Sequence, residues 1–244
     1  MLNKIINLIM ILFSKLQGKG WGSQTVEQEI RAAIKLLSNN EPKLCIDIGG
    51  NEGEYTEKLI SKYPNCSVVI FEPSRHNNKI LNSKFKKNKN IIIEKEAVTN
   101  FEGNATLFND FDGSGLASLT KRKLDHFNLE LSNSENVTTI TFEKYWKEKL
   151  GSKNIDICKL DIEGHEFHAL SSFGDSLNYI DLIQFEFGGC NIDTRTFFQD
   201  FWYFFKERDF DLYRISPLGL IRILEYKESD EFFIATNYIA KKKL

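Results

Sequence analysis

Short apolar runs alternate with amphipathic stretches along most of the chain. Five runs have the length of strands and are bounded by turn residues, and stretches with helical spacing of apolar residues lie between them. The runs are KLCIDIG (43–49), CSVVIFEP (66–73), NIIIEKEAV (90–98), NIDICKLDIEG (154–164) and YIDLIQFEF (179–187). Strands that alternate with helices in this way are typical of a parallel sheet with helices on both faces. The pattern therefore predicts a Rossmann-like α/β fold.

The pattern changes toward the C-terminus. FDLYRIS (210–216) and LIRILEY (220–226) flank Pro217-Leu218-Gly219, which predicts a hairpin, and EFFIATNYIA (231–240) predicts a last strand. We therefore expect the mostly parallel sheet to end in an antiparallel C-terminal strand.

Two stretches near the middle of the chain are harder to interpret. NATLFN (104–109) predicts a short extra strand, and residues 109–136 form the longest weakly patterned region. Long irregular segments in compact domains tend to be lids or binding loops. We therefore interpret residues 109–136 as a flap.

The first 40 residues contain an apolar block from Ile5 to Phe13 that only Asn7 interrupts. The block is too short for a transmembrane helix, and it lacks the small-residue cleavage pattern of a signal peptide. We interpret residues 1–40 as a helical segment that packs on the domain or on a partner subunit, with peripheral membrane contact as the alternative. Residues 41–244 are predicted to form a single catalytic domain.

Composition and charge exclude some classes of function. The 244 residues are 41% hydrophobic and 27% charged, which fits a globular protein, and the net charge of −2 gives no general attraction to nucleic acid. The cysteines at positions 45, 66, 158 and 190 form no CxxC pair, and most of them lie in apolar runs. We therefore expect reduced core cysteines in a cytoplasmic protein.

Candidate chemistry gathers where the predicted strands end. In an open parallel sheet, ligands bind beyond the carboxyl ends of the strands. Five segments follow strands and carry the candidate residues, most of them acidic: Asp47 to Gly53, Glu72-Pro73, Glu96-Ala97, Asp161 to Glu166, and Glu186. These segments are expected to meet at one edge of the sheet.

The glycine turn and the acid after the second strand indicate a ligand that carries a nucleoside. Gly49 and Gly53 allow a sharp turn and close approach of a ligand, and the helix that follows offers free N–H donors. Glu72 is placed to accept hydrogen bonds from a ribose diol. The structural alternative is that the glycines only make a turn and that Glu72 caps the helix beginning at Ser74.

Two cofactors fit such a site, a nicotinamide dinucleotide and S-adenosylmethionine. The turn reads Gly-Gly-Asn-Glu-Gly over residues 49–53, which does not match the G-x-G-x-x-G of dinucleotide sites, and Glu52 and Glu54 would repel a pyrophosphate. Asp47 with acids nearby suits a ligand that carries an ammonium and a sulfonium. These features favour S-adenosylmethionine.

Several of these motifs resemble those of the FkbM-type methyltransferases, which use S-adenosylmethionine and have a Rossmann-like sheet. The resemblance runs from about Lys43 to Glu186, and its most specific element is D-x-E-G-x-E at 161–166. It rests on IDIGGNEGEY (46–55), FEPS (71–74), KLDIEGHE (159–166) and QFEF (184–187), with GSGLASL (113–119) in the flap and the final TNYIA (236–240) also similar. Gly50 stands where the family commonly has alanine, a change that we expect to leave binding intact.

The resemblance implies a role for each part of the site. Asp47, Gly49 and Gly53 would border the methionine part of the cofactor, Glu72 would hold the ribose, and Glu96 and Ala97 would lie by the adenine. The predicted cofactor-binding set also contains Asn51, Pro73, Ser74 and Asp161.

The family mostly methylates hydroxyl groups of sugars or natural products. The resemblance therefore implies an O-methyltransferase for a sugar hydroxyl, on a nucleotide-activated sugar such as a heptose or on a glycan intermediate of bacterial capsule or surface polysaccharide. Methylation of a natural-product hydroxyl, a nicotinamide-dependent oxidoreductase and a non-catalytic cofactor-binding subunit are the alternatives. The partner is a small-molecule or nucleotide-linked sugar, with no nucleic acid, and a homodimer stays open.

Methyl transfer to an alcohol requires an aligned acceptor and removal of a proton. Asp161, Glu163 and His165 are the candidate general bases. A Mg²⁺ ion shared by Asp161 and Glu186 would be another way to lower the pKa of the hydroxyl. We favour a metal-independent site, in which these acids form ion pairs with Lys159 or Arg195 instead.

Overall fold

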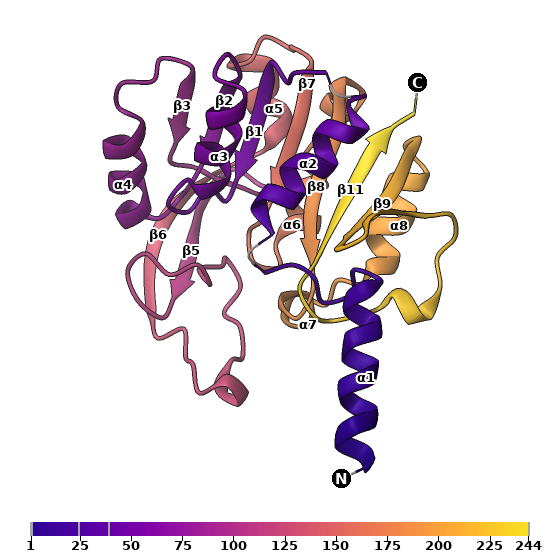
Figure 1. Cartoon of the computed structure of the whole chain (residues 1–244). Helices are drawn as coiled ribbons and strands as arrows, with labels where there is room; N and C mark the ends of the chain where they lie inside the picture. Colours follow the sequence, from indigo (N-terminus) through magenta and orange to yellow (C-terminus); the bar gives the residue numbers. More distant parts are fainter. Residues whose placement is uncertain (1, 24, 39, 244) are drawn as a thin grey trace.

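The computed structural model describes residues 2–23, 25–38 and 40–243, and residues 1, 24, 39 and 244 lie outside the described part. Within these ranges the chain forms one eight-stranded sheet and one three-stranded sheet (Figure 1). The order of the large sheet is β10 (Gly219–Ile223), β9 (Phe210–Ser216), β11 (Thr236–Lys242), β8 (Ile180–Phe187), β7 (Ile155–Leu160), β1 (Leu44–Ile48), β2 (Ser67–Phe71) and β3 (Ile91–Glu94).

The direction of the strands confirms the predicted fold class. The strands from β8 to β3 run parallel, whereas β11 pairs antiparallel with both β8 and β9, and β9 and β10 form the predicted hairpin. The large sheet is therefore Rossmann-like with an antiparallel C-terminal edge, and the carboxyl ends of its parallel strands lie together.

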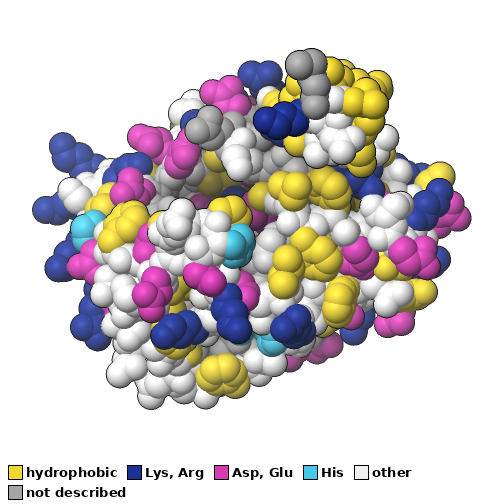
Figure 2. All heavy atoms as spheres, turned by 90° about the horizontal axis from the view of Figure 1, so that it is seen from below, with side chains coloured by type: hydrophobic (Ala, Val, Ile, Leu, Met, Phe, Trp, Pro, Cys, Tyr) yellow, Lys and Arg dark blue, Asp and Glu magenta, His cyan; other side chains and the backbone are white. Residues whose placement is uncertain are grey.

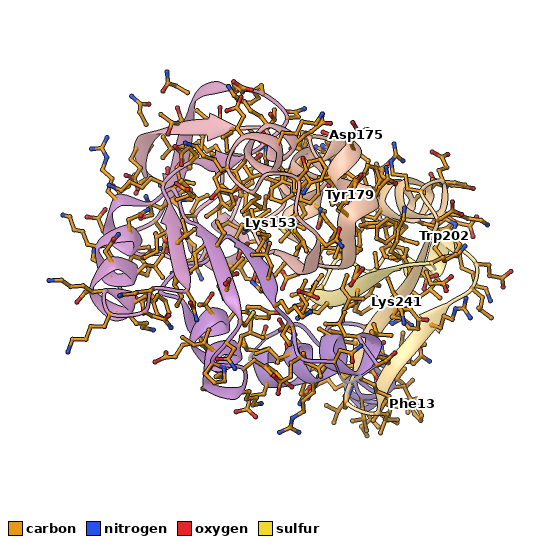
Figure 3. All side chains as sticks on the ribbon, turned by 90° about the horizontal axis from the view of Figure 1, so that it is seen from above. Phe13, Lys153, Asp175, Tyr179, Trp202 and Lys241 are labelled. Carbon is orange, nitrogen blue, oxygen red and sulfur yellow. The ribbon has the colours of Figure 1, made fainter. Side chains whose placement is uncertain are left out.

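Helices cover both faces of the large sheet because its strands are apolar on both sides. One face packs against α2 (Val26–Leu36), α3 (Glu54–Lys62) and α4 (Arg75–Phe85). The other packs against α5 (Phe142–Glu148), α6 (Glu166–Leu170), the 3₁₀ turn η2 (Gly174–Tyr179) and α8 (Phe198–Lys206). Figure 3 shows Trp202 of α8 and Tyr179 on the opposite side of the sheet from α2 and α3. Two short elements, α7 (Cys190–Thr194) and the 3₁₀ turn η3 (Glu228–Asp230), lie in the connections around the C-terminal strands.

The alternation along each strand decides which side chains meet. Ile46 and Ile48 of β1 belong to the core under α5 and α8, whereas Cys45 belongs to the core under α2 and α3. Since side chains alternate between faces, Asp47 also points toward α3, and Lys159 of β7 points to the same side. This register brings a buried acid and a buried lysine together at the strand ends.

The prediction of one strand over residues 90–98 is wrong. The chain turns at Lys95 and Glu96, and Ala97–Val98 form a separate strand, β4, in the small sheet with β6 (Asn133–Ile140) and β5 (Gly103–Asn109). Ala97, Leu107 and Val137 make the core of that sheet. Burial of Ala97 against Leu107 thus redirects the chain at the end of β3.

The boundary of the flap also needs correction. Asn133–Ile140 forms β6, so the irregular connection covers residues 110–132 rather than 109–136, with one 3₁₀ turn, η1, at Asp125–Phe127. The sequence of β6 is polar, and only Val137 and Thr139 of its residues are buried. We call this connection, residues 110–132, the flap. In Figure 1 the flap and the small sheet extend below the large sheet.

The N-terminal helix α1 (Leu2–Leu16) has no buried residue and projects away from the rest of the chain in Figure 1. By contrast, α2 packs on the sheet through Ile30 and Ala33. Over the described ranges, no helix has both the length and the apolar character needed to cross a membrane. All four cysteines are buried and free, as predicted for core residues.

Candidate active site

Most of the predicted site residues gather in a pocket at the carboxyl ends of β1, β2 and β7. Those that line it are Gly49, Asn51, Glu72, Pro73, Glu96, Ala97, Asp161, Glu163 and His165. An adjoining hollow shares Gly49, Asn51 and Asp161 with the pocket and is also lined by Asp47. Gly53 and Ser74 line neither space.

Glu72 joins two turns at the floor of the pocket. One carboxylate oxygen accepts from the N–H of Asn51 at 2.7 Å, and the other accepts from the N–H of Ser74 at 2.8 Å. Ser74 itself caps α4 through its hydroxyl, so the helix does not depend on Glu72 for its cap. Burial raises the pKa of Glu72 to about 7, although the N–H groups of Ser74 and Asn51 oppose the rise. Each oxygen of Glu72 thus keeps a lone pair free for a ligand in the pocket, and burial disfavours the ionised form of its carboxyl group.

The glycines of the first turn are required by packing within the protein. Gly49 has φ +86°, and a Cβ there would overlap the carbonyl oxygen of Asp161. Gly53 has φ +81°, and a Cβ there would meet Phe85 and Leu81 of α4. Our reason for these glycines, room for a ligand, is therefore incomplete: Gly49 lets two strand ends approach each other, and Gly53 lets α3 and α4 pack closely.

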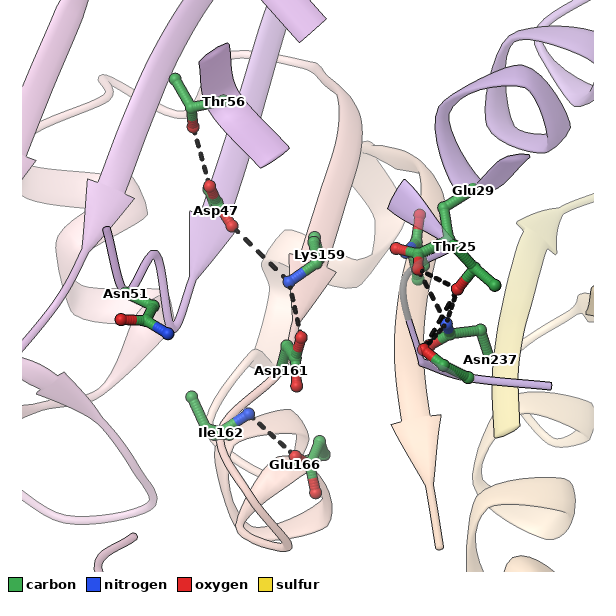
Figure 4. Close-up of polar contacts among 12 residues, drawn as sticks. Thr25, Glu29, Asp47, Asn51, Thr56, Lys159, Asp161, Ile162, Glu166 and Asn237 are labelled. Atoms are coloured by element: carbon green, nitrogen blue, oxygen red, sulfur yellow. Dashed lines mark hydrogen bonds and ion pairs between the residues drawn. The ribbon is translucent and has the colours of Figure 1, made fainter. Parts of the chain in front are cut away.

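Lys159 lies between the carboxylates of Asp47 and Asp161 in the lining of the adjoining hollow (Figure 4). Its ammonium lies 3.0 Å from Asp161 and 3.9 Å from Asp47, whose other oxygen accepts from the Thr56 hydroxyl at 2.7 Å. Burial disfavours a charged Lys159, but Asp161, Asp47 and Glu29 outweigh it and raise the pKa of Lys159. Burial raises the pKa of Asp47, and Lys159 opposes that rise. The side chain of Lys159 thus stays charged inside the protein.

Glu166 shapes the turn that follows β7. Its Oε1 accepts from the N–H groups of Ile162 at 2.9 Å and Gly164 at 3.2 Å. Glu163 and Gly164 both have positive φ values, 53° and 97°, so the turn is tight. Burial raises the pKa of Glu166 to about 8. The specific D-x-E-G-x-E motif therefore contains one acid that holds the turn and two, Asp161 and Glu163, that face the pocket.

The flap lines the pocket and is bound to the turn after β7. Its Arg122 guanidinium pairs with the Glu163 carboxylate and lies 3.8 Å from Asp193, and its Ser118 hydroxyl donates to the Glu163 carbonyl at 2.9 Å. Burial and Asp161 raise the pKa of Glu163 to about 7, and Arg122 opposes the rise. Five flap residues line the pocket: Ser114, Gly115, Ala117, Ser118 and Leu119.

The sequence also matches a known domain. The model of the methyltransferase FkbM domain matches residues 47–212, which is more than half of the chain. The chain belongs to the FkbM methyltransferase family. A search of curated proteins returned no match.

Solved structures with similar folds are remote in sequence. An S-adenosylmethionine-dependent O-methyltransferase from Thermotoga maritima is 13% identical, with 89% of this chain and 65% of that chain covered and a TM-score of 0.46. The plantazolicin methyltransferase BpumL, solved with S-adenosylhomocysteine, is 11% identical, with coverages of 97% and 90% and a TM-score of 0.48. The N-methyltransferase NodS from Bradyrhizobium japonicum is 10% identical, with coverages of 91% and 99% and a TM-score of 0.45. The chain thus spans less than two thirds of the first of these proteins.

Within the FkbM domain, His165 is held on one side by Thr99. Its Nε2 lies 2.8 Å from the Thr99 hydroxyl, and its ring stacks on that of His168. Burial, together with His168, lowers the pKa of His165 to about 4. A histidine in this environment is neutral at pH 7 and is a weak proton acceptor.

The second route that we considered, a shared Mg²⁺, finds no support in the geometry. No group of three histidine, cysteine or acidic side chains is arranged to hold a metal in the described ranges. Asp161 is paired with Lys159 instead, the ion pair that we expected as the alternative. Burial and the neighbouring acids, beginning with Asp161, raise the pKa of Glu186 well above its ordinary value.

The residues that sequence reasoning missed are those whose partners come from distant segments. Lys159 was recognised as an ion-pair partner but not as the centre of the acids at the strand ends, and Thr99, Asn77 and Arg122 were not singled out. Asn77 lines the pocket and donates to the Asn51 side chain at 3.1 Å. A signal for Arg122 was present, because it is the single arginine of the predicted flap.

Proposed function

We propose that this protein transfers the methyl group of S-adenosylmethionine to a hydroxyl oxygen of a sugar, within a catalytic domain formed by residues 41–244. The observation that carries the proposal is the pocket in which Glu72, the glycine turn and the Asp161–Glu166 turn meet inside an FkbM domain. The position of Glu72 suits a ribose diol, since both of its oxygens are fixed and keep lone pairs free.

The charge of the adjoining hollow supports a cationic ligand. It is lined by six acids, Glu29, Asp47, Glu52, Glu54, Glu57 and Asp161, and by two lysines, Lys84 and Lys159. Because Lys159 already pairs with Asp47 and Asp161, these two acids are less available to an ammonium than the sequence suggested. The excess of carboxylates still favours the ammonium and sulfonium of the cofactor over a pyrophosphate.

When bound, S-adenosylmethionine supplies an electrophilic methyl group on a sulfonium. The chain has to orient the acceptor, exclude water and accept a proton. The flap, held by Arg122 and Ser118, lines the pocket and limits the access of water to it. We assign Asp161 as the base that accepts the proton of the acceptor hydroxyl. Its side chain is 43% exposed, and Lys159 fixes one of its oxygens. Glu163 is engaged with Arg122, and the lowered pKa of His165 makes it a poorer base.

The proposed class of methyl acceptor rests on the family resemblance and on the presence of Asp161 as a base. A sugar hydroxyl needs a base for transfer, whereas a free amine does not need one of the same strength. We propose a nucleotide-activated sugar or a glycan intermediate as the acceptor. The buried free cysteines support a reducing compartment such as the cytoplasm.

Binding and transfer can be tested separately. Thermal-shift and calorimetric titrations with S-adenosylhomocysteine and with a nicotinamide dinucleotide should show binding of the first alone. Transfer of isotopically labelled methyl from S-adenosylmethionine should then be measured on panels of nucleotide sugars, other alcohols and amines, with the product bond assigned by NMR. Binding of the dinucleotide alone would contradict the proposed cofactor, and an N-methyl product would contradict the proposed acceptor. Binding of S-adenosylhomocysteine without transfer to any panel member would favour a non-catalytic subunit.

A further inference from the structure

The N-terminal helix α1 exposes large apolar side chains over its whole length. Ten of them, at 37–69% exposure, are Leu2, Ile5, Ile6, Leu8, Ile9, Met10, Ile11, Leu12, Phe13 and Leu16. Figure 2, which views the molecule from below, shows hydrophobic side chains gathered on this projecting helix. An apolar surface of this kind marks an interaction site, because water-exposed patches of this size are unusual in globular proteins.

The residues of α1 separate into two halves around the helix axis. At 3.6 residues per turn, an unbroken apolar arc of about 200° contains Leu2, Ile5, Ile6, Leu8, Ile9, Met10, Leu12, Phe13 and Leu16. The other side carries Asn3, Asn7, Ser14 and the two lysines, together with Ile11. Lys4 and Lys15 lie beside the Leu8 edge of the apolar arc. Such an arc fits a flat interface better than the narrower seam of a helix pair.

The charge of this segment has one sign. Over residues 1–26 the charged side chains are Lys4, Lys15 and Lys19, and the first acid is Glu27. The chain as a whole has a net charge of −2. The segment that carries the exposed apolar surface therefore has a local excess of positive charge, which complements an anionic partner.

The base of α1 is fixed to the C-terminal part of the fold, at β9, β11 and the turn η3. The Gln17 carbonyl accepts from Arg214 at 2.7 Å, the Gly20 N–H donates to the Thr236 hydroxyl at 2.8 Å, and Lys19 lies 3.5 Å from Asp230. At Gly18, which has φ +80°, a Cβ would overlap the carbonyl oxygen of Ile215. The fold thus holds the first turn after the helix in place and presents α1 outward.

We propose that α1 binds an anionic lipid bilayer, with its apolar arc in the membrane interface and its lysines at the headgroups. Its 15 residues span about 22 Å, which is shorter than a bilayer core, so it would lie in the surface rather than cross it. Lys4 and Lys15 reach the lipid phosphates while their stems cover apolar atoms. This attachment is independent of the proposed reaction.

Flotation of the full chain with lipid vesicles tests the proposal. Binding should be about tenfold stronger to vesicles rich in phosphatidylglycerol than to pure phosphatidylcholine, and it should weaken as salt rises. The double variant Ile9→Asp/Phe13→Asp should lose binding by about a hundredfold or more, and Lys4→Gln/Lys15→Gln should lose about tenfold for anionic vesicles only. Leu218→Asp, at an 80% exposed position in the β9–β10 turn, is the matched control and should bind as wild type.

Two outcomes would overturn the proposal. One is vesicle binding that neither the lipid charge nor the α1 variants alter. The other is a dimer in sedimentation equilibrium that Ile9→Asp/Phe13→Asp dissociates, combined with no binding to vesicles, because a second copy would then cover the arc. The affinity for S-adenosylhomocysteine should be unchanged in every variant, which shows that the variants are folded. This measurement also distinguishes a failure of the proposed membrane binding from a failure of the proposed reaction.

Discussion

The strand-end site and helix α1 depart from the usual distribution of residues in opposite directions. At the site, charged Lys159 and Asp47 are 5% and 1% exposed, whereas on α1 apolar Phe13 is 59% exposed. Buried charges persist when they are paired, and the site supplies those pairs from within the chain. The apolar arc of α1 has no such partner among the described residues. The charges of the site are thus neutralised by partners within the chain, whereas the apolar arc of α1 requires a partner outside the chain.

The largest expected effect is on the chemistry of the site. Asp161→Asn should lower kcat by about 10²–10⁴, because the amide cannot accept the proton of the acceptor hydroxyl. Affinity for S-adenosylhomocysteine should stay within about threefold, since Lys159 keeps Asp47 as an ion-pair partner. Calorimetry and a labelled-methyl assay measure the two quantities.

Asp175→Asn is the matched control for this substitution. Its side chain is 74% exposed, and its ion-pair partner is the surface residue Lys147. Figure 3 shows Asp175 at the periphery of the molecule. We expect unchanged turnover for Asp175→Asn. Full activity of Asp161→Asn would remove Asp161 from the mechanism and return attention to Glu163.

The next effect concerns the stability of the buried pairs. Lys159→Met should lower the free energy of unfolding by about 3–5 kcal/mol, because it leaves Asp47 buried without a cation. Urea unfolding measures the loss. Addition of Asp47→Asn should restore part of it, and the deficit should shrink as the pH falls and Asp47 takes up a proton. By contrast, Lys58→Met on the exposed surface of α3 should leave the unfolding midpoint in place, and an equal loss there would contradict the special role of Lys159.

Much of the fold could be predicted because its main strands are short and apolar on both faces. The runs at 43–49, 66–73, 154–164 and 179–187 all contain strands of the large sheet. The prediction of one strand over residues 90–98 failed at the end of the run, because Ala97 and Val98 pair with residues of β6 that lie 42 positions later. Strand β6 was missed for a related reason: its polar sequence is stabilised by pairing rather than by an apolar pattern.

The site could be predicted as a set of strand-end residues but not as a network. The topology alone places Glu72 and Asp161 at the same edge of the sheet. The sequence could not show that Lys159 pairs with both Asp47 of β1 and Asp161 after β7, or that Arg122 reaches Glu163, since these contacts depend on distances between separate elements. It also could not show that Gly53 packs on Phe85.

The smallest expected effect is on the pH dependence of cofactor binding, which distinguishes Glu72 from the other acids of the site. With the pKa of Glu72 raised to about 7, the carboxyl of the free protein is mostly protonated at pH 6 and mostly ionised at pH 8. Since a ribose diol donates to the ionised form, affinity for S-adenosylhomocysteine should be about tenfold weaker at pH 6 than well above pH 7. Glu72→Gln should bind about tenfold more weakly than wild type at pH 8 and lose this pH dependence. Calorimetric titrations from pH 6 to pH 8.5 decide the matter: a Glu72→Gln curve that keeps the wild-type slope would assign the titration to Glu163 or Glu166, whose pKa values burial also raises, to about 7 and about 8.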